Sequence, residues 1–511
     1  MGERAASGAI KSAGSLPLLL LAIGGTAEAQ PVEDVRAWTR SHEAGILSEL
    51  VDLLAIPNVA SDTDGIERNA RRLVALLGKR GFAATLLDGH GGPPAVLGEL
   101  RTPGARRTLG VYIHYDGQPV EPEKWSSAPW APMLRDGPVE QGGRERPLEP
   151  PLGPEWRLYA RSASDDKAPI VGWLSALDAL KATGHAPGVN LKLLLDGEEE
   201  AGSAHLPAVL AREKARLAAD LWLLCDGPVH QTRRPQVFFG ARGVMGVELT
   251  LYGPLRPLHS GHYGNWAPNP AAALARLIAS ARDDEGRVLV EGFYDDVRPP
   301  TEAERAALAR SPDNDADLRR SLALGRTEGA VPLVEAILRP ALNVRGIASG
   351  AVGEKAANAI PAEARASIDF RLVPDQRPER VRAAFEEHLR RQGFEVVHEA
   401  PDAEARRSQR RLVRLEWDAG YPAARAPLDS PEAKAVLAAV AEASGLEPVV
   451  MPTLGGSLPM YLFTEVLGAP VIGVPIANHD NNQHAADENL RLQNLWDGIA
   501  IYATLLLRVG D

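Results

Sequence analysis

The fold is indicated most clearly by residues 109–119, Leu109-Gly-Val-Tyr-Ile-His114-Tyr-Asp116-Gly-Gln-Pro119, in a chain of 511 residues. Their apolar half, Leu109–Ile113, has the form of a buried strand and ends directly in polar side chains. Leu191–Leu195 and Leu221–Cys225 repeat this form, and helical patterns flank the runs. Strands that alternate with helices predict an α/β domain with helices on both faces of its sheet.

The pattern changes near Gly243 and returns to the α/β type after about Gly420. Between these points Val247–Leu251 and Ala364–Leu372 alternate polar and apolar residues, as antiparallel strands with one solvated face do. We therefore expect a smaller α+β domain inserted into the α/β domain. The expected boundaries are 30–243 and 421–511 for the two parts of the catalytic domain, and 244–420 for the inserted lid or dimerisation domain.

Two further stretches have a distinctive composition. Thr301–Leu324 is rich in charge and reads as one helical stretch. Arg135–Pro154 combines many Gly, Pro and charged residues, which predicts a disordered insertion. The alternative is a surface loop beside the functional site, because the stretch directly precedes an Asp-Asp motif.

Residues 1–29 have the pattern of a secretory signal peptide. Arg4 and Lys11 precede the apolar run Leu16–Ile23, and the small-residue sequence Ala27-Glu-Ala29 follows. The run is shorter than the ~20 residues that span a bilayer, and no later segment reaches ~18 uninterrupted apolar residues. The sequence predicts a periplasmic or secreted protein whose mature chain has no membrane span.

Composition excludes several other classes of protein. The 45% of hydrophobic residues excludes global disorder, and a single cysteine excludes a disulfide scaffold. The formal net charge of −11 argues against a nucleic-acid partner. The sequence contains neither the P-loop pattern nor the G-x-S-x-G pattern of serine hydrolases.

Side chains that commonly bind metals follow several of the predicted strands. They are His114 with Asp116, Asp165-Asp166 before a helix, Glu198–Glu200, Asp226, and the stretch Asn478–His484. Each is weak alone, because an Asp pair can cap a helix and a histidine can be structural. Together they lie at the carboxyl edge of the predicted sheet, where open α/β sheets bind ligands.

The residue types in this set indicate hydrolytic metal chemistry. Histidine and carboxylate without thiolate suit a catalytic zinc site. Divalent ions acidify water and polarise carbonyl groups, and a neighbouring glutamate can pass the water's proton to a leaving nitrogen. Asp116 shares a strand face with His114 and can accept its second N–H.

In order and spacing, these motifs resemble one family. The motifs are His114-Tyr-Asp116, Ser164-Asp-Asp-Lys167, Glu199-Glu-Ala-Gly-Ser203, Asp226 and His484. The family is that of the di-zinc amidohydrolases, with carnosinase-type dipeptidases, aminoacylase, glutamate carboxypeptidase and succinyl-diaminopimelate desuccinylase. Phe239–Gly243, Leu258–Gly261 and Phe370–Pro374 resemble its dipeptidase branch. The likeness runs from about residue 35 to the C-terminus and implies a mixed-sheet zinc-peptidase domain flanked by helices.

The resemblance also implies the metal ligands. One ion would be held by His114 and Asp226, the other by Glu200 and His484, and Asp165 would bridge the two. The implied cofactors are two divalent metal ions, zinc first, with manganese or cobalt as alternatives.

Further roles follow from the same resemblance. Asp116 would orient His114, and Glu199 would be the general base. In a homodimer formed through the inserted domain, His259 would reach the partner's site and support the oxyanion. The residues that would hold the substrate's carboxylate are Arg371, Asn358, Gly456 and Ser457.

The sequence departs from the family pattern beside the aspartate pair. Ala160-Arg161-Ser162 replaces Gly-Arg-Gly, and Ala168 replaces a glycine, which leaves the ligands intact and the substrate size open. We expect cleavage of dipeptides or short peptides with a free C-terminal carboxylate. The alternatives are deacylation of N-acyl amino acids by the same site, and a non-catalytic binding protein of the same fold. The last would have lost a ligand or the base, and neither is lost.

Overall fold

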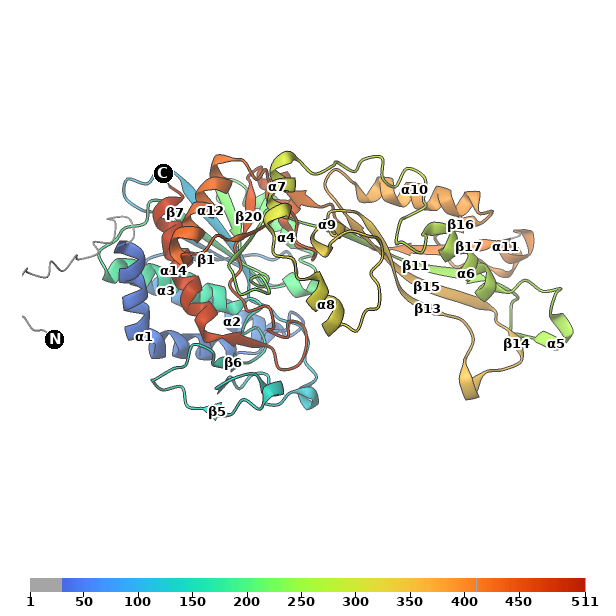
Figure 1. The fold of residues 1–511 in the computed structure, drawn as a ribbon. Coiled ribbons are helices and arrows are strands. Elements are labelled where there is room, and N and C mark those ends of the chain that lie inside the picture. The colour runs from blue at the N-terminus through green and yellow to red at the C-terminus, as the bar shows by residue number, and fades with distance from the viewer. Residues whose placement is uncertain (1–29, 410, 511) are drawn as a thin grey trace, which may run out of the picture.

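The computed structural model describes residues 30–409 and 411–510, and the sequence-predicted signal peptide lies outside them. Two sheet-based parts lie side by side in Figure 1, with the long strands β11 (Gly243–Tyr252) and β15 (Glu363–Leu372) extending into the second part. None of the helices within the described ranges is long and apolar enough to cross a membrane.

The first part is built on an eight-stranded mixed sheet, the large sheet, in the order β1-β2-β7-β3-β8-β20-β9-β19. β3 lies between β7 and β8 and is parallel to both, whereas β1 and β2 are antiparallel additions at one edge. The strands are β1 (Ala83–Leu87), β2 (Ala95–Leu100), β3 (Thr108–His114), β7 (Asn190–Asp196), β8 (Leu221–Leu224), β9 (Gln236–Phe238), β19 (Val449–Met451) and β20 (Val471–Gly473).

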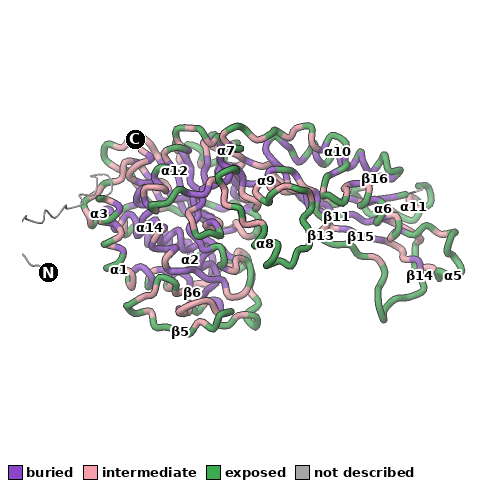
Figure 2. The backbone as a smooth tube through the Cα atoms, viewed as in Figure 1, coloured by how far each residue is buried: buried purple, intermediate pink, exposed green. Residues whose placement is uncertain are grey.

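Both faces of the large sheet are covered. Along β3, Val111 and Ile113 enter one hydrophobic core and Tyr112 enters the core on the opposite face. This two-sided burial explains why the strands are apolar without interruption. Figure 2 shows buried residues in purple through the interior of this part. One face packs against α1 (Gln30–Leu54), α3 (Lys167–Ala182), α12 (Pro431–Ser444) and α14 (Leu492–Arg508), and the other against α4 (Leu206–Arg212) and α13 (Met460–Leu462).

The second part holds a five-stranded sheet, the inserted sheet, in the order β13-β15-β11-β17-β16. Met245, Val247 and Leu249 of β11 enter its core, whereas Val244 and Glu248 alternate with them on the other face. The elements are β11 (Gly243–Tyr252), β13 (Ala341–Ala348), β15 (Glu363–Leu372), β16 (Glu395–Val397), β17 (Leu412–Trp417), α6 (Pro270–Ala281) and α10 (Pro378–Arg391). A short pairing of β12 (Leu258–His259) with β14 (Ala359–Ile360) lies at its far tip (Figure 1).

The stretch Thr301–Leu324 is two helices and not one. α7 (Glu302–Arg310) ends before Ser311-Pro312, and α8 (Asp315–Ser321) follows. Proline lacks the backbone N–H of a helix and disfavours helical geometry in the residue before it, so the break falls there. α7 packs against β19, and Glu304 forms a buried ion pair of 2.9 Å with Arg425. α7 therefore rests on the large sheet, and α9 (Leu333–Ala336) packs Val334 against the core on one face of that sheet.

The predicted disorder of Arg135–Pro154 is wrong. The start of this stretch belongs to a four-stranded sheet in the order β21-β6-β4-β5, formed by β4 (Met133–Arg135), β5 (Glu145–Arg146), β6 (Arg157–Tyr159) and β21 (Asn489–Arg491). The N–H of Val139 also donates to the Tyr159 hydroxyl at 2.9 Å. The Gly and Pro residues form turns between paired segments, which composition alone does not distinguish from disorder.

Candidate active site

The strands of the large sheet bring the candidate ligands to one edge. β3, β7 and β8 are parallel neighbours, so their carboxyl ends meet there. β3 ends at His114, β7 leads into Glu199 and Glu200, and β8 leads into Asp226. Asp165 lies just before α3, and His484 comes from the long connection between β20 and β21.

Asp165 lies between two histidines. Its Oδ1 is 2.8 Å from Nε2 of His114, and its Oδ2 is 3.2 Å from Nε2 of His484. The same nitrogen of His484 is 3.2 Å from Oε2 of Glu200. Asp165 therefore has the position that a bridging carboxylate between two cations requires.

Within the described chain, the possible metal ligands form two overlapping groups. The groups are His114 with Asp165 and Glu200, and His114 with Glu199 and Asp226, in each of which the ligand atoms lie within 4.8 Å of one another. Burial raises the pKa of Asp226 to about 7, and the charge of Asp165 adds to the effect. Several buried carboxylates this close repel one another, and divalent cations relieve that repulsion. The donor set therefore fits a metal centre.

The structure separates the roles of the three consecutive glutamates. Glu198 turns away, because its carboxylate accepts the backbone N–H of His205 at 2.6 Å and pairs with its ring at 2.8 Å. Glu199 faces the cluster, and burial raises its pKa well above the usual value, with Asp226 and Glu200 adding to the shift and His114 opposing it. A carboxyl group with a raised pKa is suited to exchange a proton near neutral pH.

Asp116 contacts both His114 and the two glutamates Glu199 and Glu200. Its Oδ1 is 3.3 Å from Nδ1 of His114. Its two carboxylate oxygens accept the backbone N–H groups of Glu199 and Glu200, each at 3.0 Å. Asp116 therefore fixes the orientation of the imidazole and of the turn η3 (Glu199–Ala201) together.

A cavity of about 500 Å³ connects this cluster with the inserted sheet. Asp165, Glu199, Asp226 and His484 line one side, and Arg371, Gly456, Ser457 and the apolar Leu454 and Leu458 complete it. Arg371 donates to the Ser457 hydroxyl at 2.8 Å and to Asp369 at 2.9 Å. Three of the four residues expected to hold the substrate's carboxylate, namely Arg371, Gly456 and Ser457, thus lie beside the candidate ligands. These ligands are called the metal-type cluster below: His114, Asp165, Glu199, Glu200, Asp226 and His484.

His259 and Asn358 lie elsewhere in the chain. They are neighbours at the far tip of the inserted sheet, where the backbone N–H of Ser260 donates to Asn358 O at 2.9 Å (Figure 1). Nδ1 of His259 accepts the N–H of Gly261 at 3.1 Å. One chain by itself does not bring these two residues to the cluster.

Glu488 is a site residue that sequence reasoning missed. Its buried carboxylate accepts the backbone N–H groups of Ser162, Ser164 and Asp165 at 2.9, 3.0 and 3.0 Å. It also accepts the Ser164 hydroxyl at 3.1 Å and a guanidinium N–H of Arg161 at 2.8 Å. Glu488 therefore holds the chain segment that presents Asp165. The sequence signal that could have marked Glu488 as a site residue was its position four residues after His484.

The stretch before β6 supports the connection that carries His484. Asp487 accepts the backbone N–H and the hydroxyl of Ser126, each at 2.8 Å, and Glu140 accepts the side-chain amide of Asn482 at 3.1 Å. Asn482, His484 and Asp487 all have positive φ, at 56°, 62° and 58°. Such backbone is costly for residues other than glycine and persists where the surroundings fix it. These contacts from Ser126 and Glu140 help to fix it.

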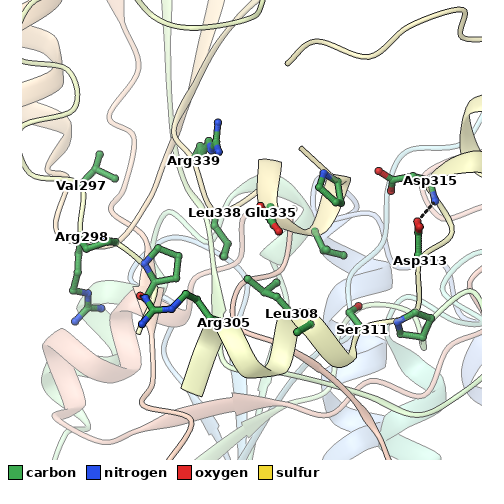
Figure 3. A pocket seen from close by; sticks show the side chains of 16 residues that line it. Val297, Arg298, Arg305, Leu308, Ser311, Asp313, Asp315, Glu335, Leu338 and Arg339 are labelled. Carbon is green, nitrogen blue, oxygen red and sulfur yellow. Dashed lines mark hydrogen bonds between the residues drawn. The ribbon is translucent and has the colours of Figure 1, made fainter. Parts of the chain in front are cut away.

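A second cavity, of about 760 Å³, lies between α7, α9 and the chain that enters the inserted sheet (Figure 3). Its lining includes Arg298, Arg305 and Glu335 but, among the described residues, no histidine. Asp313 accepts the backbone N–H of Asp315 at 3.1 Å, the dashed line in Figure 3. The metal-type cluster, and not cavity size, therefore locates the candidate active site.

The fold and the metal-type cluster indicate a metallopeptidase, and comparison with known proteins indicates the same class. Residues 110–508 match the model of peptidase family M20/M25/M40, so the chain belongs to this family and is a metallopeptidase.

Several relatives align over most of the chain. The Cys-Gly metallodipeptidase Dug1 of Schizosaccharomyces pombe is 26% identical over 91% of this chain and 93% of its own. The Beta-Ala-His dipeptidase of Homo sapiens is 26% identical over 82% of this chain and 78% of its own. Among solved structures, an M20 family metallo-carboxypeptidase from Sulfolobus solfataricus is similar with a TM-score of 0.77 and 30% identity, over 91% of this chain and 99% of that one.

Proposed function

We propose that the protein is an exported dipeptidase with two divalent metal ions and Glu199 as its general base. One observation carries the proposal: the half-buried Glu199 and the metal-type cluster share a cavity with Arg371, a cation suited to a free carboxylate. The names of the relatives Dug1 and Beta-Ala-His dipeptidase support dipeptides as the substrate class.

The chain offers ligands for both ions. His114 and Asp226 would hold one, Glu200 and His484 the other, and Asp165 would lie between them. Zinc is the ion proposed first, with manganese or cobalt as alternatives, because the donors are imidazole and carboxylate without thiolate. Bound divalent cations supply Lewis acidity, which polarises a carbonyl group and acidifies water.

The remaining chemistry belongs to side chains of the protein. Glu199 takes a proton from the attacking water and delivers it to the leaving nitrogen of the cleaved amide. Arg371, fixed by Ser457 and Asp369, binds the C-terminal carboxylate of the substrate, and Gly456 lies beside it. A dipeptide held by its carboxylate in this way presents its amide bond to Glu199.

We further propose a homodimer formed through the inserted part, in which a second copy of the chain supplies His259 and Asn358. Both residues lie at the exposed tip around β12 and β14. His259 would then donate a hydrogen bond to the oxygen that becomes negative during the reaction.

The test combines two substitutions with a substrate panel. Glu199→Gln should lower kcat by roughly 10²-fold or more while metal content stays normal, because it removes the base and leaves the ligands. Glu200→Gln is the matched control and should lose metal. Reversed metal contents would contradict the assigned roles. A panel of dipeptides and N-acyl amino acids separates dipeptidase from deacylase activity.

A further inference from the structure

β11 arranges three side chains in one row at its N-terminal end. Val244 pairs with Arg371 of β15 on one side and with Tyr421 on the other. The N–H of Val244 donates to Tyr421 O at 3.1 Å, and the N–H of Tyr421 donates to Val244 O at 2.8 Å. Residues directly opposite each other in antiparallel strands share a face of the sheet. Arg371, Val244 and Tyr421 therefore lie in a row on one face.

This face is the one turned away from the core of the inserted sheet. Met245, the next residue of β11, enters that core, and so does Phe370, which precedes Arg371. Val244 and Arg371 alternate with these two and are both half-buried. The row therefore lies on the face of the sheet that carries the side chain of Arg371, and Arg371 lines the cavity.

Tyr421 is held against a second aromatic ring. It stacks on Tyr461 of α13, with ring centroids 5.2 Å apart and an interplanar angle of 11°. Four residues before Tyr461, Ser457 accepts a hydrogen bond from Arg371 at 2.8 Å. The segment from Ser457 to Tyr461 therefore runs along the row, with Arg371 at one end and Tyr421 at the other.

Two charged residues of the site influence the hydroxyl of Tyr421. Burial raises the pKa of its hydroxyl, the charge of Glu199 raises it further, and the charge of Arg371 lowers it. Leu454 and Leu458 line the same cavity. The cavity next to Arg371 therefore has an apolar part, formed by Leu454 and Leu458.

We propose that Tyr421 and Tyr461 form the wall of a subsite for the side chain of the substrate's C-terminal residue. The enzyme then prefers dipeptides that end in a large apolar or aromatic residue. This inference rests on the proposed function, because a carboxylate bound by Arg371 places the neighbouring side chain over Val244. Two strand spacings, roughly 10 Å, separate the ends of the row, which leaves room for a leucine or phenylalanine side chain. Offset aromatic packing adds to the binding of phenylalanine.

The test compares kcat/KM of the metal-loaded protein for Ala-Gly, Ala-Leu and Ala-Phe. We expect Ala-Leu and Ala-Phe to exceed Ala-Gly by roughly 10-fold or more, since even one methylene group in an apolar pocket discriminates by about 10-fold or more. Tyr421→Ala should lower the value for Ala-Phe by about 10-fold and change that for Ala-Gly by less than about 3-fold. Tyr421→Phe should retain both, because the ring and not the hydroxyl forms the wall.

Tyr252→Ala is the matched control, since Tyr252 is a half-buried tyrosine at the opposite end of β11 and should affect neither substrate. Tyr461→Ala provides a second variant if Tyr421→Ala does not fold, and should show the same selective loss. Inhibition by free phenylalanine, stronger than that by glycine, should weaken in both variants.

The outcomes separate this inference from the proposed function. Equal kcat/KM for Ala-Gly and Ala-Phe in the unaltered protein would overturn the subsite and leave the dipeptidase intact. Equal losses on both substrates in the Tyr421→Ala and Tyr461→Ala variants would also overturn it, because the rings would then act on the reaction itself. Hydrolysis of none of the three dipeptides by the metal-loaded protein would overturn both proposals.

Discussion

Replacement of Glu488 by glutamine should damage the metal site without removing a ligand. The carboxylate accepts five hydrogen bonds: Oε1 accepts from Ser164 N–H, the Ser164 hydroxyl and Asp165 N–H, and Oε2 accepts from Arg161 and Ser162 N–H. An amide keeps one oxygen and turns an NH₂ group toward at least two of these donors.

Two charge-assisted hydrogen bonds at about 1.5–3 kcal/mol each give a loss of about 3–6 kcal/mol of folding free energy. This range agrees with the ~3–5 kcal/mol for leaving one partner of a buried ion pair, here Arg161, without the other. Because Asp165 is held through this network, metal affinity should also fall by roughly 10- to 100-fold.

Calorimetric metal titration and thermal unfolding measure both effects. Glu155→Gln is the matched control, since Glu155 pairs with Arg491 at 2.9 Å but is 55% exposed, and such pairs contribute about 1 kcal/mol or less. If Glu488→Gln unfolded at the temperature of the unaltered protein and bound metal equally well, the positioning role of Glu488 would be refuted.

Three other predictions concern different parts of the chain. Burial lowers the pKa of Lys167, which donates to Leu53 O and Ile56 O, from 10.5 to about 7. Between these pH values the unfolded chain binds the proton that the folded chain lacks, so stability should rise with pH by up to about 1.4 kcal/mol per unit. Lys167→Met should lack this rise in thermal unfolding, and a pH-independent difference between the two proteins would contradict it. Mixing inactive His259→Ala and Glu199→Gln proteins under subunit exchange should restore part of the activity, and no recovery despite proven exchange would exclude His259 donated between copies. N-terminal sequencing of the native protein should begin close to Gln30, whereas a cytoplasmic protein that begins at Met1 would refute export.

Site residues could be predicted from the sequence where an apolar strand pattern is combined with a parallel strand arrangement. Apolar runs that end in His114, Glu199 and Asp226 predict strands, and parallel strands bring their carboxyl ends to one edge. The structure places these three residues there, although they are separated by up to 112 positions (226 − 114). The alternation in Ala364–Leu372 likewise predicts a strand, which is β15.

Residues that act through long-range contacts were not predictable in this way. Glu488 follows Asp487 in a polar connection and looks like a solvated residue, yet it is buried against a segment more than 300 positions earlier. Tyr421 precedes a proline in an irregular stretch, and its place beside Arg371 depends on pairing with Val244. Composition wrongly predicted disorder for 135–154, because the pairing of β4 with β5 and β6 and the hydrogen bond from Val139 to Tyr159 decide its order.

The most direct test of the di-metal peptidase mechanism is a metal titration of metal-stripped protein that follows dipeptide hydrolysis at each step. Hydrolysis should be absent at the start, rise with added Zn²⁺ or Mn²⁺, and reach its maximum at two equivalents per chain, which elemental analysis of the loaded protein should confirm. Full activity in the metal-stripped protein, or a maximum at one equivalent, would contradict it.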